Sequence, residues 1–366
     1  MRYLVNDVTR VNPKAKLTTA VISSITGLTY PDKKFIQVVG ESGIKILKDT
    51  VICVGESIFK TERDITLNSA NLDSGSFTLG KDYYVYCCDK GGEADEEYKI
   101  SLNSTFPVGY TATSSRKIGG FHYGHVRRKN ENIEPINSSG VAWGSGWEEN
   151  IYVGILPFSV WTLAHRPTCS PEGMIYAKGI GKWVDIYELS TNYRSEYNGT
   201  PMTGSEGISI WDWHEKVASR IGKVPLSYLE SCCVGDGSPN GRDETNDYCW
   251  TKTTNSGRNP AGIIAKAVSA YDVKDAVGNV YKTCSDTSWS TQAYSGTGGA
   301  WKWQDTEKDS VKKGQFYAAY TSDLHVAIVG GDWSNGVHCG SRTVALNDYP
   351  WDVSSNVGCR FACDSL

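Results

Sequence analysis

The stretch that most constrains the fold is the glycine-rich C-terminal segment from residue 327 to residue 366. It contains the short motifs Gly330-Gly331, Gly340-Ser341-Arg342 and Gly358-Cys359-Arg360, together with the aromatic residues Trp333 and Phe361. Glycine permits positive φ and close approach of neighbouring backbones, and large aromatic side chains supply buried area. The pattern predicts a rigid frame that displays an exposed polar face. The small or polar residues expected on that face are Asp332, Ser334, Asn335, His338, Asn347, Asp348, Tyr349, Asp352, Ser354, Ser355 and Asn356.

The composition indicates a turn-rich, mainly β protein. The 366 residues include 38 Gly, 21 Tyr and 12 Trp, and a chain of this length has room for two or three domains. Tyr, Trp, Ser, Gly and Asn are also frequent in binding surfaces, because aromatic rings give contact area at a low cost in entropy. The formal net charge is −4 and the pI is about 5.9. No basic field therefore favours nucleic acid or an anionic membrane as a partner.

The eleven cysteines include two adjacent pairs, Cys87-Cys88 and Cys232-Cys233. No CxxC spacing suggests a zinc site, and no secretory signal precedes the first strand-like segment. We therefore expect mostly free thiols in a protein assembled in a reducing cytoplasm, and one or two disulfides remain compatible with the sequence. No apolar run approaches the length of a membrane span, so membrane insertion is not expected.

Hydrophobic alternation divides the first part of the chain. Residues 1–45 contain short runs at Thr18–Ile25 and Phe35–Val39, which predict a small β N-terminal region that packs against copies of itself or against the next domain. Residues 46–150 predict a β-sandwich-like domain, in which residues 130–150, rich in Asn, Ser and Gly, form a linker. The strands expected in that domain are Thr50–Gly55, Ser76–Leu79, Lys81–Asp89 and Ile118–Tyr123.

The remaining residues, 151–366, change character. Ser209–Gly222 places apolar residues on one helical stripe and ends at a glycine suited to a C-cap. A second helix is expected from Leu226 to Val234, with Pro225 at its start. Two consecutive helices among strands favour a mixed module over a continued sandwich. The sequence therefore predicts a mainly β protein with an α+β C-terminal module.

Several segments resemble one family, the variable proteins of diversity-generating retroelements. Within it, the chain is similar to the major tropism determinants, which are receptor-binding proteins at the tail-fibre tips of bacterial viruses. The resemblance implies a C-type lectin fold of the formylglycine-generating-enzyme subgroup for residues 151–366 and a β-prism-like, trimerising region for residues 1–45. The segments that carry it are Leu79–Asp89, Phe106–Tyr123, Trp161–Leu189, Gly222–Leu229 and Gly330–Asp364.

The same resemblance implies a function and a location. The protein would be part of a virion, a homotrimer that binds a host-cell surface protein or glycan, without a cofactor and without enzymatic activity. Its diversified, ligand-binding positions would be Asp332, Ser334, Gly336, His338, Ala345, Asn347, Asp348, Asp352, Ser354, Asn356 and Val357. Such retroelements mutate adenines in AAC or AAT codons, and each of these residues is reachable from such a codon by changing adenines alone.

Other residues of the segment have expected roles of their own. Tyr349 and Trp351 are candidate aromatic anchors for a ligand, and an ordinary core role fits them equally well. A surface that varies must not carry the fold, so the expected scaffold residues should be buried or hydrogen-bonded. These scaffold residues are Trp333, Arg342, Arg360 and Phe361.

Three other functions fit parts of the pattern. A copper-dependent oxidase of the formylglycine-generating type uses two cysteines after its GG-x-[WY] motif, but the corresponding stretch here has only Cys339. A calcium-dependent lectin would need several oxygen ligands, for which Asp348, Asp352 and Asn356 are candidates, although no EPN-like or QPD-like tripeptide is present. A purely structural virion protein is the third alternative. The sequence alone assigns no metal.

Overall fold

The computed structural model describes residues 30, 32–91, 96–288, 300–305, 313–319 and 324–366. The described chain forms two compact units. Unit 1 contains residues up to Gly124 and residues 153–166, together with Leu366, and unit 2 contains residues 125–152 and 167–365. These units do not coincide with the ranges 1–45, 46–150 and 151–366, because a strand crosses residue 45 and because residues 125–152 pack with the later unit.

Unit 1 is built of β-sheets around one apolar core. A three-stranded sheet has the order β1-β2-β5, β3 and β4 form a hairpin, and a larger sheet has the order β10-β8-β6-β7, with β9 also paired to β8. The shared core contains residues from the three-stranded sheet, from the hairpin and from the larger sheet, as expected of a β-sandwich. The strands are β1 (Ile36–Val39), β2 (Gly43–Ile46), β3 (Val51–Val54), β4 (Ser57–Lys60), β5 (Ile65–Leu67), β6 (Lys81–Asp89), β7 (Glu96–Ser101), β8 (Ser115–Arg127), β9 (Ile151–Ile155) and β10 (Trp161–Thr162).

The expected strand Ser76–Leu79 is wrong. Residues 76–79 have no strand partner, because their polar groups bond to one side chain instead. The Tyr83 hydroxyl accepts a hydrogen bond from the Thr78 amide at 2.8 Å and donates one to the Ser76 carbonyl at 3.1 Å. Phe77 packs its ring against Tyr83 and anchors the segment to the core. The expected strand Thr18–Ile25 lies outside the described residues.

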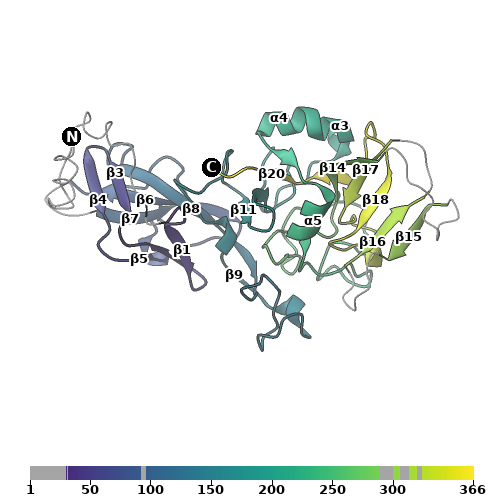
Figure 1. The fold of residues 1–366 in the computed structure, drawn as a ribbon, viewed down its shortest axis with the longest axis horizontal. Coiled ribbons are helices and arrows are strands. Elements are labelled where there is room, and N and C mark those ends of the chain that lie inside the picture. Colours follow the sequence, from purple (N-terminus) through teal and green to yellow (C-terminus); the bar gives the residue numbers. More distant parts are fainter. Residues whose placement is uncertain (1–29, 31, 92–95, 289–299, 306–312, 320–323) are drawn as a thin grey trace. The chain divides into compact units, whose positions relative to one another are not determined.

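Unit 2 contains two sheets and a short helical segment (Figure 1). One sheet has the order β11-β12-β20-β13 and the other has the order β15-β16-β18-β17-β14-β19. The strands are β11 (Met174–Ala177), β12 (Lys182–Asp185), β13 (Val224–Pro225), β14 (Tyr281–Ser288), β15 (Lys302–Asp305), β16 (Gln315–Ala318), β17 (His325–Val329), β18 (Val344–Asp348), β19 (Val357–Cys359) and β20 (Phe361–Cys363). The helices are α3 (Ile210–Asp212), the π-helical turn η5 (Trp213–Val217), α4 (Ala218–Ile221) and α5 (Tyr228–Gly235).

Both expected helices are present, and capping residues explain their bounds. Ser209 caps α3 in a reciprocal capping box with Asp212, and Gly222 ends α4 with a positive φ of 66°. Ser227 caps α5 in the same way. The second helix therefore begins after Ser227, and Pro225, expected at its start, belongs to β13.

Residues 130–150 are not a linker, which corrects the expectation from their composition. The buried Arg127 guanidinium donates hydrogen bonds to the carbonyls of Trp147, Glu148 and Val268, at 2.9, 2.8 and 3.0 Å. Isolated β-bridges, among them one from Lys129 to Pro135, add to the order of this segment. The backbone of residues 130–150 is therefore held by the buried Arg127 guanidinium, an interaction that the composition of the segment did not predict. Short 3-10 turns complete the described structure: η1 (Ser69–Asn71), η2 (Trp147–Glu149), η3 (Pro157–Ser159), η4 (Gly204–Glu206) and η6 (Gly336–His338).

Candidate functional site

The candidate site lies on the six-stranded sheet of unit 2 and on the loops that follow two of its strands. β18 pairs in parallel with β16 and antiparallel with β17. The segment 332–338 follows β17, and the segment 349–356 connects β18 to β19. Seven of the eleven positions proposed to vary lie in these two loops, while Ala345, Asn347 and Asp348 lie in β18 and Val357 lies in β19.

Eight aromatic rings form a continuous series across this region, which we call the ring ladder. Going along it, the successive ring centroids are 6.2, 5.2, 4.8, 5.7, 5.4, 5.0 and 4.6 Å apart. These separations are those at which aromatic pairs attract one another. The rings come from α3 and from segments around β15, β16, β17 and β18, whose ribbons are grouped in Figure 1. In order, the ladder is Trp211, Trp351, Tyr349, His325, Trp301, Tyr317, Trp303 and His338.

One end of the ladder is open to solvent. Trp351 is 55% exposed and Trp211 is 48% exposed, whereas His325, in the middle, is 1% exposed. Val353, two residues after Trp351, is also exposed, at 57%. At the other end of the ladder, Val337 beside His338 is 59% exposed. Large apolar groups exposed on an ordered frame are typical of binding surfaces, and Trp is the residue most enriched among energetically dominant contacts.

The backbone of the loop that carries Trp351 is fixed by hydrogen bonds. The amide of Trp211 donates to the Pro350 carbonyl at 2.8 Å, and the amide of Ile210 donates to the Asp352 carbonyl at 3.0 Å. The Gly204 amide donates to the Ser354 carbonyl at 3.0 Å. Because these bonds use main-chain groups, side chains of the loop can change without removing them.

Asp332 joins the two loops. Its carboxylate accepts a hydrogen bond from the Ser334 amide at 2.8 Å and another from the Asn356 side-chain amide at 2.7 Å. Its own amide donates to the Asn335 side chain at 3.0 Å. Asp332 is 4% exposed, so these partners replace the water that the buried carboxylate has lost.

The acidic side chains of the 347–352 segment are also engaged within the chain. The Asn347 side-chain amide donates to Asp348 at 2.7 Å, and the Tyr349 amide donates to Asp352 at 2.8 Å. Burial, with a further contribution from the nearby Asp352 carboxylate, raises the pKa of Asp348 to about 6. This segment therefore holds a carboxyl group that titrates well above the range of an exposed aspartate.

The structure divides the eleven positions proposed to vary into three groups. Asn347 is exposed, whereas Ser334, His338, Asp352, Ser354 and Asn356 are half-buried. Asp332, Gly336, Ala345, Asp348 and Val357 are buried in the single chain, so the expectation of exposure is wrong for Asp332 and Asp348, the two of these residues that were placed on the exposed face. Ala345 and Val357 pack in one apolar cluster with Ile328, and Asp332 is buried by the hydrogen bonds that join the loops.

The exposed positions of the 349–356 loop alternate with the positions proposed to vary. Trp351, Val353 and Ser355 are exposed, and the residues between them, Asp352 and Ser354, are half-buried. Of the two candidate anchors, Trp351 is the exposed one and Tyr349 is half-buried between Trp351 and His325. Among the scaffold candidates, Arg360 and Phe361 are buried, and Trp333 and Arg342 are half-buried.

Sequence reasoning missed five members of the ring ladder. Their signal was present in part, because Trp301-Lys302-Trp303 places two indoles on the same face of a strand. Strand pairing then sets Trp303 opposite Tyr317. The contacts between strands required the sheet order, which no local pattern contains. The missed residues are Trp211, Trp301, Trp303, Tyr317 and His325.

The chemistry of the alternatives finds little support here. Burial raises the pKa of the Cys339 thiol well above its ordinary value. No group of three or more His, Cys, Asp or Glu side chains arranged to hold a metal occurs among the described residues. Within the same residues, no helix is long and apolar enough to cross a membrane.

The geometry can be compared with known proteins. Residues 34–148 match the family model of the Mtd second domain. The chain is 26% identical over 349 residues to the tail fiber receptor-binding protein of Bordetella phage BPP-1, an alignment that covers 89% of this chain and 81% of that protein.

Solved structures agree with these matches. The Major Tropism Determinant I1 variant superposes with a TM-score of 0.70 at 21% identity, and the P3c variant with a TM-score of 0.68 at 23% identity. Both alignments cover 96% of this chain and 88% of the other. The expected mainly β architecture with a C-type lectin fold is thereby confirmed. The chain is therefore similar to the Mtd proteins, because residues 34–148 match the Mtd second domain and the described fold is that of the Major Tropism Determinants.

Proposed function

We propose that this chain is the receptor-binding, tropism-determining protein of a bacterial virus. The observation that carries the proposal is the exposed end of the ring ladder, formed by Trp211 of α3 and by Trp351, which lies on a loop whose backbone is held by main-chain hydrogen bonds. The similarity to a tail fiber receptor-binding protein supports the same function. The ligand is a protein or glycan of the host-cell surface. No catalytic activity, cofactor or nucleic acid enters the proposal.

The proposal extends to how the surface varies and how it is displayed. Exposed or half-buried positions such as Asn347, Ser334 and His338 change the contact surface, while the buried positions of the proposed set tune how the loops are held. A homotrimer at a tail-fibre tip presents several copies of this surface, which raises weak single-site binding through avidity. A reverse transcriptase gene and a near-copy of the coding segment for residues 330–366 beside this gene would support diversification, and their absence would argue against it.

Binding to intact cells of the bacterium that the virus infects tests the recognition surface. The surface variant carries Trp211→Ala and Trp351→Ala, and the matched control carries Phe106→Ala and Val108→Ala, which remove comparably exposed apolar side chains from unit 1. We expect the surface variant to bind at least about tenfold more weakly, since buried interface tryptophans are worth about 2 kcal/mol or more. The control should bind like the wild type.

Thermal unfolding is measured on the same samples to separate recognition from folding. Equal unfolding temperatures with lost binding in the surface variant support the proposal. Unchanged binding of the surface variant, or an equal loss in the control, would overturn it.

A further inference from the structure

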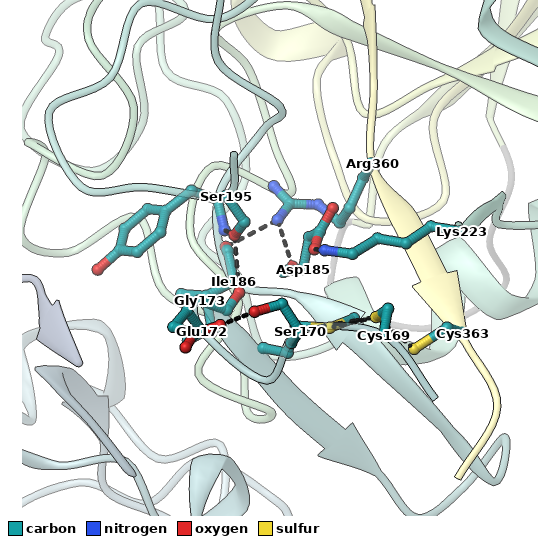
Figure 2. Close-up of polar contacts among 12 residues, drawn as sticks. Cys169, Ser170, Glu172, Gly173, Asp185, Ile186, Ser195, Lys223, Arg360 and Cys363 are labelled. Carbon is teal, nitrogen blue, oxygen red and sulfur yellow. Dashed lines mark hydrogen bonds and ion pairs between the residues drawn. The ribbon is translucent and has the colours of Figure 1, made fainter. Parts of the chain in front are cut away.

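Two cysteines far apart in the sequence meet at the end of β20, in the first sheet of unit 2. Cys169 precedes β11 and Cys363 ends β20, and their Sγ atoms lie 2.9 Å apart across 194 residues of chain (Figure 2). Both are present as free thiols. This separation is shorter than ordinary contact between two sulfur atoms and longer than the S–S bond of about 2.05 Å. The two sulfurs are therefore placed for reaction with each other.

Pairing between the backbones of the two segments places the cysteines opposite each other. Pro167 and Ser365 form an antiparallel bridge, so the register places Cys169 directly opposite Cys363. The amide of Thr168 donates to the Asp364 carbonyl at 3.0 Å, which makes that pair hydrogen-bonded and the adjacent cysteine pair non-hydrogen-bonded. Opposite residues at such positions have Cα atoms about 4.5 Å apart, within the range that a disulfide spans.

The charges around the pair favour one thiolate. The hydrogen bond from Cys169 lowers the pKa of Cys363 to about 6, with help from the Cys169 amide, Thr168 and the Lys223 ammonium, while burial opposes the change. The same hydrogen bond, together with burial, raises the pKa of Cys169 well above its ordinary value. Figure 2 shows Lys223 directed to Asp185, with which it forms an ion pair, beside the two thiols.

The pair differs from other cysteines of the same unit. Burial raises the pKa of Cys359 and of Cys284, and neither has another cysteine sulfur as a hydrogen-bond partner. Cys169 is half-buried, so a small reagent can reach its sulfur, whereas Cys363 is only 5% exposed. Cys169 is therefore the more accessible thiol of the pair.

We propose that Cys169 and Cys363 are a redox-modification site, which a small-molecule disulfide converts into an intramolecular disulfide that fastens β20 to the segment before β11. Because Cys169 is the more exposed thiol, the attack starts from the less populated state in which its proton has moved to the Cys363 thiolate. The Cys169 thiolate attacks the reagent R–S–S–R, forms a mixed disulfide and releases one thiolate. That thiolate takes the proton from Cys363. The Cys363 thiolate then attacks the Cys169 sulfur, forms the protein S–S bond and releases the second thiolate, which takes a proton from water. Two electrons pass from the protein sulfurs to the reagent.

The cross-link has a structural consequence for the frame of unit 2. β20 pairs with both β12 and β13, and the buried Arg360 immediately precedes it. A bond that closes a loop of this length restricts the unfolded chain far more than the folded one. Oxidation therefore fixes the C-terminal strand in a medium that is more oxidising than the cytoplasm.

The test uses the full chain, first reduced and then incubated with oxidised glutathione at pH 8. Free thiols are alkylated, and peptides are mapped by mass spectrometry with and without subsequent reduction. We expect a linked peptide pair containing Cys169 and Cys363, with the loss of two hydrogen atoms. The midpoint of thermal unfolding of the oxidised protein should be higher by on the order of 5 °C or more.

Variants identify the order of the two steps. Cys363→Ser should stop at a stable mixed disulfide between glutathione and Cys169, and Cys169→Ser should react at neither position. Cys232→Ser is the matched control, since it removes a half-buried thiol from α5, and it should form the linked peptide like the wild type. The wild-type result does not depend on whether a variant folds. Complete alkylation of both cysteines after oxidation of the folded wild type, or linkage of either one to another cysteine, would overturn the proposal.

Discussion

The indole of Trp303 stacks on the imidazole of His338, with ring centroids 4.6 Å apart and planes 3° from parallel. His338 also shares a hydrogen bond with the side chain of Gln315, in the neighbouring strand β16. His338, a position proposed to vary, thus stacks on Trp303, a ring that belongs to strand β15 of the sheet. The same arrangement holds along the ladder, because the exposed rings at one end are connected through ring contacts to half-buried rings of the sheet.

Removing the support under His338 should weaken binding more than folding. Trp303→Ala deletes the stacking partner, so we expect binding to host cells to fall by roughly tenfold, equivalent to about 1.4 kcal/mol. Trp303→Phe keeps a stacked ring and should restore most of the loss. Cell binding and thermal unfolding of both variants check this. If Trp303→Ala and Trp303→Phe bind equally well, the support from Trp303 is irrelevant to recognition.

Features set by near neighbours in the chain were predictable from the sequence. β6 has the predicted bounds Lys81–Asp89, because its alternation is local. The helical segment begins after Ser209 and ends at Gly222. Both bounds were predictable because a capping serine and a C-cap glycine can be recognised in the sequence. The strand predicted at Ser76–Leu79 failed because the Tyr83 hydroxyl satisfies its polar groups, a contact that no periodicity reports.

Burial at the candidate site was much less predictable. Ala345 is a small residue in a strand, and its burial follows from packing with Ile210 and Tyr281, far away in the sequence. An aspartate such as Asp332 is expected at the surface, and its burial depends on the hydrogen bond from Asn356, which is 24 residues away in the sequence. Sequence reasoning identified the two loops, while their inward and outward side chains depended on tertiary contacts.

The carboxyl group of Asp348 should make stability depend on pH. Burial raises its pKa to about 6 in the folded protein, compared with about 3.9 in an unfolded chain. The folded state therefore binds more protons than the unfolded state between these values. The contribution of this group to stability is largest below pH 4 and is lost as the pH rises towards 6.

Asp348→Asn tests this pH dependence. The variant keeps an acceptor for the Asn347 amide but cannot ionise, so at pH 7.5 it should be more stable than the wild type by about 2 kcal/mol. Denaturant unfolding between pH 4 and pH 7.5 measures the difference, with the exposed Glu62→Gln as control. An unchanged pH slope between 4 and 6 in Asp348→Asn would contradict the assignment.

Gly340 is required because there is no room for a side chain. A Cβ atom placed there would lie 2.1 Å from the Lys313 carbonyl oxygen and 2.4 Å from the Gly314 nitrogen, both of them backbone atoms. We expect Gly340→Ala to lower the free energy of unfolding by about 3 kcal/mol, since the backbones must separate. Gly257→Ala, where a Cβ meets nothing within 4 Å, is the control and should change stability by less than about 0.5 kcal/mol. Equal unfolding midpoints for the two variants would refute the steric explanation.

Arg360 holds the core of unit 2 through main-chain carbonyls. Arg360 is 3% exposed, and its guanidinium donates hydrogen bonds to the carbonyls of Asp185, at 2.8 Å, and of Ile186, at 2.7 Å (Figure 2). It also donates to the Lys274 carbonyl. Arg360→Met keeps much of the volume but leaves these carbonyls buried without donors, so we expect unfolding to become easier by about 3 to 5 kcal/mol.

The control for this substitution is Arg194→Met, because Arg194 is an exposed arginine of the same unit. Denaturant unfolding of both variants gives the comparison, and the control should lie within about 0.5 kcal/mol of the wild type. Because Arg360 lies between β19 and β20, a destabilised Arg360→Met protein should also lose cell binding in proportion to the unfolded fraction, and full binding at low temperature should return. Binding that stays lost in fully folded Arg360→Met protein would instead make the guanidinium part of the recognition surface, which its burial argues against.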